Sequence, residues 1–499
     1  DDLAVGGDII TTSAGTSNVR VGVSAGSSIE SGGNHNVAVG NEAGTAITTG
    51  DGNIVIGFES GHDITTGGYN LLIGWKAGDK IDTASQNVAI GDGSLSADTK
   101  GSKSVAVGSN TLNTQNFTSA TDSYNTAVGY NAGVSVTTGI NNTLIGGLAG
   151  DAITTGFSNS LVGKLSGSAL TDADYNVAMG QQSLAQDTQG STSVAIGSFA
   201  LGTQNFTSAT DSYNTAVGYA AGSAITTGIY NNLVGSLTGD ALTDADSNVA
   251  IGYASLSTDT LGSRSIAIGH GALNSQNFTS ATNVENVAVG YAAGNVITTG
   301  FKNTIVGALG YDNLQNGDRN IAIGYDTTSS GVNDSLSIVI GVGITSGGAG
   351  AARIGNSGGT ATLGLDGSDT SWAAASDSRL KKDVENSTVG LEFIKDLRPV
   401  TFKWNAKDAI ANTLPQYDAD SSDPIYGTGK AHHGFIAQEV KAVIDSHSDV
   451  VNGHNLWSED PDGTQQVSPS ALVPMLTKAV QELSTALDAA LVRIATLEG

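Results

Sequence analysis

The chain has 499 residues, a formal net charge of −26 and no cysteine. Without cysteine it has neither disulfides nor thiolate metal sites, and the acidic balance argues against nucleic acid, because phosphate binding needs a basic surface. No apolar run approaches the length of a membrane span, so we expect no membrane insertion, and no motif indicates a cofactor or a metal.

The composition changes sharply near Ser376, which predicts two differently built parts. All six prolines follow this residue, and 61 of the 68 glycines precede it. We expect a lead-in over 1–17, a repeat shaft over 18–345, a glycine-rich transition over 346–375 and a globular domain over 376–499.

A pentapeptide of the form N-V-A-V-G recurs nineteen times, usually at intervals of 17 residues. Self-similarity at a short fixed period is typical of a solenoid in which each repeat forms one coil. We therefore predict a mainly β fold with a parallel β-solenoid or β-roll shaft of 17-residue coils. The pentapeptides begin at Asn18, Asn36, Asn53, Asn70, Asn87, Ser104, Asn125, Asn142, Asn159, Asn176, Ser193, Asn214, Asn231, Asn248, Ser265, Asn286, Asn303, Asn320 and Ser337.

The first full 17-residue unit shows what one coil can form. Val37 and Val39 are two residues apart and share one face of a short strand, whereas Ala38 faces the other way. Gly40 is expected to end the strand at a bend with positive φ, and Ile47 to begin a second short extended piece. A unit with so few core side chains needs neighbours above and below in order to fold.

Stacking of the coils sets the expected size and bonding of the shaft. Parallel strands at about 4.8 Å give nineteen coils a length of roughly 90 Å. The asparagine at the first repeat position is expected to form a ladder of amides, each bonded to the next coil. The alternative is that this asparagine only forms turns.

Three intervals are 21 residues long, and each contains a near-copy of N-T-Q-N-F-T-S-A-T-D-S-Y. They run from Ser104 to Asn125, Ser193 to Asn214 and Ser265 to Asn286. Their four extra residues are expected to bulge from the stack. A sugar could stack on the aromatic rings there, although we favour structural protrusions or rings placed between subunits. The rings belong to Phe117, Phe206 and Phe278.

The pentapeptide resembles the N-[ST]-V-A-[IV]-G repeat of trimeric autotransporter head domains and of many bacteriophage tail fibres. The resemblance covers about residues 18–345, although the 17-residue period is longer than the usual head repeat. It implies a left-handed parallel β-roll in which three chains share one axis. The slender core of such a coil and the 5% of aromatic residues also favour a homotrimer.

Beyond residue 375, four segments predict a small α+β domain that ends in a long helix. The first is S-D-S-R-L-K-K-D from Ser376; Leu397–Trp404 is a strand entered through a proline, and His433–Val440 leads into a helix. The segment 470–498 has apolar residues at steps of four and three, the seam of a coiled coil. The alternative is an amphipathic helix packed on its own domain. The seam consists of Leu476, Val480, Leu483, Leu487, Ala490, Ile494 and Leu497.

Together these segments resemble the intramolecular chaperone domain of endosialidases and other phage tail fibres, the peptidase S74 family. The motifs S-D-x-R-L-K, G-F-I-A-Q-E-V and A-x-Q-E-L occur in order over about residues 376–499. The resemblance implies that the domain trimerises, helps the fibre to fold and then cuts the Ala375–Ser376 bond. The family's serine–lysine dyad maps onto Ser376 as nucleophile and Lys381 as base.

The dyad is chemically reasonable because a serine hydroxyl becomes a good nucleophile only when a base takes its proton. Ser376 would attack the carbonyl of the residue before it, so the chain itself supplies the proximity. His432 and His433 could assist, although an adjacent histidine pair before glycine is more often structural. Self-cleavage is the only enzymatic activity that we expect, and none is predicted on external substrates.

The leading hypothesis is a phage tail fibre, made in the host cytoplasm and carried outside the cell on the virion. Its expected partners are two further copies of the chain, other tail proteins and a host cell-surface receptor, expected to be a glycan. A bacterial trimeric adhesin is the main alternative. Such adhesins end in a membrane segment with a final aromatic residue, whereas this chain ends at Leu497-Glu-Gly499 after a heptad seam.

Two further functions are less favoured. Pairs such as Thr48-Thr49 suggest the threonine ladder of an ice-binding solenoid, but adjacent threonines face opposite sides of a strand. A polysaccharide depolymerase needs two carboxylates across a groove, whereas acids such as Asp172 and Asp174 lie scattered in repeat loops.

Overall fold

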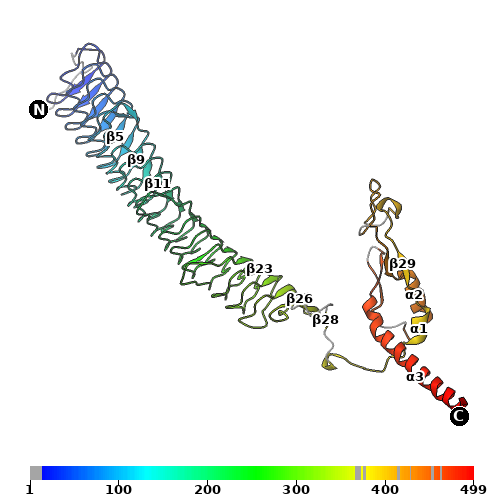
Figure 1. Cartoon of the computed structure of the whole chain (residues 1–499). Coiled ribbons are helices and arrows are strands. Elements are labelled where there is room, and N and C mark those ends of the chain that lie inside the picture. Colours follow the sequence, from blue (N-terminus) through cyan, green and yellow to red (C-terminus); the bar gives the residue numbers. More distant parts are fainter. Residues whose placement is uncertain are drawn as a thin grey trace. The chain divides into compact units, whose positions relative to one another are not determined.

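The computed structural model of the chain divides into two compact units, Asp1–Ala375 and Ser376–Gly499, and each is described by itself (Figure 1). The lead-in expected over 1–17 lies outside the described residues except for its last four. The structure describes residues 14–365, 373–374, 378–412, 416–426, 429–450, 455–460 and 463–498.

The first unit is a solenoid with one short strand for each of the nineteen pentapeptides, and its coils stack in sequence order (Figure 1). Each strand pairs in parallel with that of the next coil, so that Ala38 lies beside Val55. The predicted parallel β-solenoid is confirmed. The strands are β1 (Val19–Val21), β2 (Val37–Val39), β3 (Ile54–Ile56), β4 (Leu71–Ile73), β5 (Val88–Ile90), β7 (Val105–Val107), β9 (Thr126–Val128), β10 (Thr143–Ile145), β11 (Ser160–Val162), β12 (Val177–Met179), β14 (Val194–Ile196), β16 (Thr215–Val217), β17 (Asn232–Val234), β18 (Val249–Ile251), β20 (Ile266–Ile268), β22 (Val287–Val289), β23 (Thr304–Val306), β24 (Ile321–Ile323) and β25 (Ile338–Val342).

The second extended piece expected at Ile47 does not form a strand. The amide of Ile47 donates to the carbonyl of Gly44 in a turn, and the side chain is fully buried. The prediction was wrong because apolar character indicates burial, and a loop covered by coils on both sides buries a side chain as well as a strand does. Additional short strands join each long coil to the coil before it: β6 (Gly101–Ser102) pairs with β8 (Thr121–Asp122), β13 (Gly190–Ser191) with β15 (Thr210–Asp211), and β19 (Gly262–Ser263) with β21 (Thr282–Asn283).

In the three-residue strands from β2 to β24, the middle residue points into the core. Ala38, Val55 and Leu72 are fully buried, whereas the residues on either side of them are half-buried or exposed. Alternation in the sequence shows which residues share a face, but not which face is covered. The core is completed by loop side chains such as Ile47, which close the coil opposite the strand.

Asparagines at the first repeat position form a buried ladder along the shaft. The Asn36 Oδ1 accepts the backbone N–H of Asn53 at 2.9 Å and its Nδ2 at 3.1 Å. The Asn36 Nδ2 donates to the carbonyl of Gly50, near the end of its own coil, at 2.9 Å. The pattern recurs in later coils, which confirms the predicted ladder: each amide closes one coil and joins it to the next.

Glycine ends the pentapeptide because the backbones of neighbouring coils come too close for a side chain. Gly40 has a φ of +133°, and a Cβ built on it would lie 2.5 Å from the carbonyl oxygen of Gly57. Both the backbone conformation and this close approach favour glycine over every other residue. The bend with positive φ predicted at Gly40 is therefore confirmed.

A second glycine position shows how core volume is shared within a coil. A Cβ on Gly150 would lie 2.8 Å from the Cδ1 of Ile153. In the coil that precedes the first long coil, leucine takes the place of this glycine and an acid takes the place of the isoleucine. These residues, Leu95 and Asp98, are both fully buried. One large apolar side chain thus fills the same space from either of two positions.

The sheet changes direction after the last coil. β26 (Ala351–Asn356) still runs parallel to β25, but β27 (Gly359–Gly364) and β28 (Ala373–Ala374) pair antiparallel. These strands lie in the glycine-rich segment 346–375 and bring the main sheet to 22 strands. Antiparallel strands need only a short connection, so the change of direction ends the solenoid without a further coil.

The second unit is a small α+β domain that ends in a long helix, as predicted. Phe393, Val440, Ile444 and Leu456 form its core together with Leu472. Its elements are η1 (Ser378–Leu380), α1 (Leu391–Asp396), β29 (Val400–Phe402), η2 (Lys407–Ala409), β30 (His432–Gly434), α2 (Ala437–Ser446), β31 (Trp457–Glu459), β32 (Gln465–Val467), η3 (Pro469–Ala471) and α3 (Leu472–Glu498).

Candidate functional site

The expected cleavage site lies at the start of the second unit. Ala375 and Ser376 are outside the described residues, so the approach of Ser376 to Lys381 stays a prediction. Lys381 is exposed and directly follows η1, and its amide donates to the carbonyl of Ser378 at 3.2 Å. A single short helical turn therefore separates the two dyad residues along the chain.

Two motifs of the second unit are joined by a sheet and an ion pair. β29, from L-R-P-V-T-F, pairs antiparallel with β30, from H-H-G-F, so that Thr401 lies beside His433. The Arg398 Nε donates to the Glu439 Oε2 at 2.9 Å, and its Nη2 donates to the other carboxylate oxygen. These hydrogen bonds from Arg398 lower the pKa of Glu439. The motif residues thus have a structural task, which is to join the start of β29 to α2.

The adjacent histidines belong to this small sheet. The ring centroid of His432 lies 5.7 Å from that of Phe402 and 6.4 Å from that of Trp404. The His433 Nδ1 lies 3.4 Å from the Thr401 Oγ1 on the paired strand. These contacts support a structural role for the histidine pair, as the sequence analysis favoured.

Glu482 joins two helices, a role that the sequence analysis missed. Its Oε2 accepts the amide of Leu391, at the start of α1, at 2.8 Å. A Cβ on Gly390 would lie 2.5 Å from the same carboxylate oxygen, so glycine permits this approach. A carboxylate at a helix N-terminus is favoured by the helix dipole. The sequence did contain a signal for this contact: Glu482, the glutamate of the Q-E-L motif, is not one of the apolar seam residues, so it is free to contact another element.

The first turns of α3 pack on their own unit, where Leu472 and Ala479 are buried. The predicted coiled-coil seam is exposed, from 44% for Leu476 to 80% for Leu497. An exposed apolar seam of this length suits partner helices, and the coiled coil itself stays a prediction. The seam residues Leu476, Val480, Leu483, Leu487, Ala490, Ile494 and Leu497 are all partly or largely exposed.

The phenylalanines of the long coils are not on the surface of the chain. Phe117, Phe206 and Phe278 have exposed fractions of 6%, 6% and 8%. The expectation of an aromatic surface bulge was therefore wrong for these rings. Each ring residue also donates its amide to a buried aspartate of the preceding coil, as Phe117 does to the Asp98 Oδ1 at 3.2 Å. The Phe117 ring lies close to Gly101 of the preceding coil, where a Cβ would come within 2.6 Å of its Cδ2.

Each long coil begins with serine instead of the ladder asparagine, and a glutamine later in the same coil supplies the missing amide. The Gln115 Oε1 accepts the Asn125 Nδ2 at 2.8 Å, and the Gln115 Nε2 donates to the Asp98 Oδ2 at 2.6 Å and to the Ser104 Oγ at 2.9 Å. All four residues are fully buried, and burial raises the pKa of Asp98. The other long coils repeat the arrangement with Gln204 and Gln276.

Acids and threonines that suggested other functions are engaged between coils. The Asp174 Oδ1 accepts the amide of Phe157 at 2.9 Å, and Asp172 accepts the hydroxyl of Thr155. The Thr48 Oγ1 donates to the carbonyl of Thr65 at 3.1 Å. These groups hold the stack together, so the positions that raised the depolymerase and ice-binding hypotheses have a structural explanation.

Among the described residues, one side-chain cluster has the residue types of a cation site: His62, Asp63 and Asp79. The Lys80 Nζ lies 3.1 Å from Asp63 and 3.5 Å from Asp79, so an ammonium group already neutralises the carboxylates. Burial would raise the pKa of Asp63, but hydrogen bonds from His62 and Lys80 outweigh it and lower the value. Burial raises the pKa of Asp79. The cluster is an ion-pair network.

An apolar stripe runs along the outer face of the sheet. The fourth residue of the pentapeptide lies on the face opposite the core, yet it is aliphatic or methionine in all nineteen coils. Ile251 and Ile323, for example, are 40% and 41% exposed. Eight of the nineteen side chains are exposed and the other eleven are half-buried. A continuous apolar row that is not covered within its own chain marks an interaction surface. The stripe consists of Val21, Val39, Ile56, Ile73, Ile90, Val107, Val128, Ile145, Val162, Met179, Ile196, Val217, Val234, Ile251, Ile268, Val289, Val306, Ile323 and Ile340.

Comparison with known proteins found a family match in the second unit alone. Residues 376–449 match the peptidase S74 family, described as the chaperone of endosialidase. No curated protein and no solved structure matched the chain. None of the helices in the described part of the chain is both long and apolar enough to cross a membrane. The C-terminal unit of this protein therefore contains a chaperone-of-endosialidase domain of the peptidase S74 family, which begins at residue 376.

Proposed function

We propose that this protein is a trimeric fibre whose C-terminal unit aligns three chains and is then removed by cleavage before Ser376. The β-solenoid supplies the shaft, and the chaperone-of-endosialidase domain suits a fibre-like protein. The fibre would belong to a phage tail, outside the cell on the virion, with other tail proteins and a host surface glycan as partners. A bacterial trimeric adhesin remains the second candidate, because the same shaft would serve it.

The apolar stripe is the observation that carries this proposal. Each coil buries only a few side chains, and the stripe leaves an apolar residue outside in every one of the nineteen coils. Three chains whose stripes meet along one axis would bury this surface at about 25 cal/mol per Å² of apolar area. In a closed ring of three identical chains, symmetry places the same residues of every chain toward the shared axis, and a continuous stripe can fill that position along the whole shaft.

A removable chaperone also solves a problem of this fold. Coils of nearly identical sequence pair equally well when shifted by one repeat, so the register of three chains is weakly specified. The exposed seam of α3 would fix the number of chains and align their ends before the shafts pack. Removal of the aligning unit would leave the folded shaft kinetically trapped.

The proposed cleavage is an acyl transfer followed by hydrolysis. Lys381 takes the proton of the Ser376 hydroxyl, and the Oγ attacks the carbonyl carbon of Ala375. The C–N bond breaks as the Ser376 nitrogen accepts a proton, which leaves an ester. Water then cleaves the ester and releases residues 1–375 from residues 376–499.

The stripe is tested by charge substitutions at exposed positions on and away from it, in the two neighbouring coils that begin at Asn303 and Asn320. We compare Val306→Asp with Ile323→Asp, combined on the stripe, against Val332→Asp with Leu336→Asp, combined away from it. All four side chains are between 40% and 56% exposed, so desolvation within one chain is similar. We expect the stripe variant to lose the trimer after cleavage, as measured by light scattering, and the control to keep it. A monomeric wild type, or a stripe variant as trimeric as the control, would refute the proposal.

A further inference from the structure

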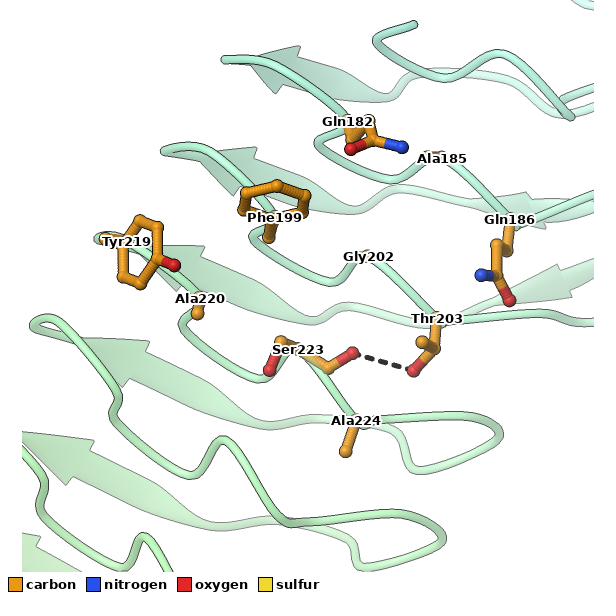
Figure 2. Close-up of a pocket in the computed structure, with 10 residues that line it drawn as sticks. All are labelled: Gln182, Ala185, Gln186, Phe199, Gly202, Thr203, Tyr219, Ala220, Ser223 and Ala224. Atoms are coloured by element: carbon orange, nitrogen blue, oxygen red, sulfur yellow. Dashed lines mark hydrogen bonds between the residues drawn. The ribbon is translucent and has the colours of Figure 1, made fainter.

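The three long coils are near-copies, and an open groove lies beside the second, where its sequence departs from the other two. Figure 2 shows the groove, which has a volume of about 580 Å³. Its floor contains Gly202, at the tenth position of the long coil that begins at Ser193. All three long coils make the same stacking contacts with their neighbours. Stacking therefore does not explain why the second differs from the other two at these positions.

In the other two long coils, an asparagine side chain occupies this place. The Asn113 Nδ2 donates to the carbonyl of Gly93 at 2.9 Å and to the Ser96 Oγ at 2.7 Å. The Asn274 Nδ2 makes the same two bonds, to the carbonyl of Ala254 and to the Ser257 Oγ.

The second long coil lacks both partners of this contact. Gly202 replaces the asparagine, and Ala185 replaces the serine of the preceding coil. Both substitutions remove side-chain atoms from the same place, so together they open the groove. The coil remains well formed, because its buried glutamine network is intact.

The groove has aromatic rings on one side and amides around it. Figure 2 shows Phe199 next to Tyr219, with Gln182 above them and Gln186 beside Thr203. The Phe199 and Tyr219 ring centroids are 6.0 Å apart with an angle of 85° between the rings. Phe199 is itself special to this coil, because Asn110 and Gly271 stand at its position in the other two.

The polar side chains at the groove differ in whether their donors and acceptors are already used within the chain. The Thr203 Oγ1 donates to the carbonyl of Ser223 at 2.7 Å, as Figure 2 shows. Within the described structure, the side-chain amides of Gln182 and Gln186 make no hydrogen bond. Two amides with donors and acceptors thus face a groove whose lining contains no Asp, Glu, Lys, Arg or His.

We propose that this groove binds a neutral saccharide, an inference that rests on the proposed receptor-binding fibre and names its ligand class and site. The apolar face of a sugar ring would pack on Phe199 and Tyr219, as aromatic groups offer large apolar area at low entropic cost. The amides of Gln182 and Gln186 would exchange hydrogen bonds with neighbouring hydroxyl groups. An acidic sugar is disfavoured, because no cation lines the groove of this strongly acidic chain.

The chain itself supplies the variant that closes the groove. Gly202→Asn with Ala185→Ser recreates the contact seen at Asn113 and Asn274. A Cβ on Gly202 would lie 3.1 Å from its nearest atom, the carbonyl oxygen of Phe199, which a small adjustment relieves. We expect this variant to fold, trimerise and be cleaved like the wild type, because it copies two native coils.

The test uses the cleaved full-length product on a printed array of neutral and acidic oligosaccharides. We expect the wild type to bind neutral glycans and the groove-closing variant to bind them about tenfold more weakly, the change that 1.4 kcal/mol represents. Phe199→Asn, which copies the first long coil, should weaken binding similarly. Equal binding by wild type and variants, binding to acidic glycans alone, or no binding to any glycan would overturn the proposal.

A matched pair of tyrosines provides the control for surface exposure. Tyr219 and Tyr291 each directly follow the glycine that ends a pentapeptide, and their side chains are 55% and 57% exposed. Of these two tyrosines, only Tyr219 lines the groove. Tyr219→Ala should weaken binding and Tyr291→Ala should not. Light scattering and intact mass on the same samples report trimerisation and cleavage. A trimeric, cleaved protein without glycan binding refutes the groove alone, whereas a monomeric wild type refutes the fibre.

Discussion

At the scale of single residues, the shaft tolerates loss of a ladder asparagine because a residue at another position supplies the missing amide. Ser104 cannot reach the next coil as an asparagine does, and Gln115 extends its amide from the widened loop into the gap. The bonds of Asp98 complete the exchange, because both of its oxygens accept hydrogen bonds from the long coil or its own turn.

Replacement of Gln115 by alanine tests this exchange. Gln115→Ala removes two buried hydrogen bonds, the one that Gln115 donates to the Asp98 Oδ2 and the one that it accepts from the Asn125 Nδ2, which we expect to cost about 3 kcal/mol locally. Hydrogen exchange of peptides covering residues 98–125 should report faster opening of these coils. The control is Gln181→Ala, an exposed glutamine, which should leave exchange unchanged. Equal protection in both variants would show that the amide is dispensable.

The glycine and leucine exchange leads to a second prediction. Gly150→Leu should overpack the core by about 1–3 kcal/mol, because a Cβ there already meets Ile153 and Leu144. Ile153→Ala should relieve the crowding, so that the double variant is more stable than the sum of the single changes predicts. Leu95 has a φ of +51°, which shows that leucine tolerates this backbone. Strictly additive losses in hydrogen-exchange protection would contradict the shared-volume explanation.

At the scale of elements, strand pairing and the Arg398–Glu439 ion pair organise the second unit. The pair joins the segment before β29 to α2, and Glu482 joins α3 to α1. Residues from motifs that are separate in the sequence therefore contact one another and join different elements. Both carboxylates lie at the first turn of a helix, where the helix dipole also favours them.

The lowered pKa of Glu439 predicts how the second unit responds to acid. Its ordinary value is 4.5, and the hydrogen bonds from Arg398 lower it in the folded chain. The pair therefore stabilises the unit above the ordinary value and loses this contribution as the pH falls through the lowered one. The effect should be small and weaker in high salt, because the pair is exposed.

Helix circular dichroism at 222 nm during thermal unfolding measures this dependence between about pH 6 and about pH 3. Arg398→Met and Glu439→Gln should each flatten the loss of melting temperature on acidification. The Lys441→Met variant keeps this pair and removes a different ion pair of α2, so it serves as the control. An unchanged acid response in both pair variants would mean that other groups cause it.

At the scale of the whole molecule, the proposed cleavage separates assembly from its product. Ser376→Ala should leave a full-length chain of 499 residues that still trimerises, because the α3 seam is untouched. Lys381→Met should do the same. Intact mass spectrometry and light scattering check both variants. Cleavage of Ser376→Ala at the wild-type bond would disprove the dyad.

The sequence by itself determined the architecture of the shaft and its bonding. A period of 17 residues predicts one coil per repeat, and Asn36 and Gly40 were correctly assigned to the amide ladder and to the bend. These inferences succeeded because each depends on local backbone geometry or on the contact between identical positions in successive coils. The boundary near Ser376 was visible for a similar reason, since proline and glycine contents differ between a solenoid and a globular domain.

Only the tertiary structure decided which side chains are covered. It placed Ala38 inside and its neighbours outside, buried Phe117, made Ile47 part of a turn and opened the groove at Gly202. Alternation along a strand assigns residues to faces, but burial depends on what lies above, below and across the coil. Those neighbours come from other parts of the chain, and their volumes combine only when the coils are stacked.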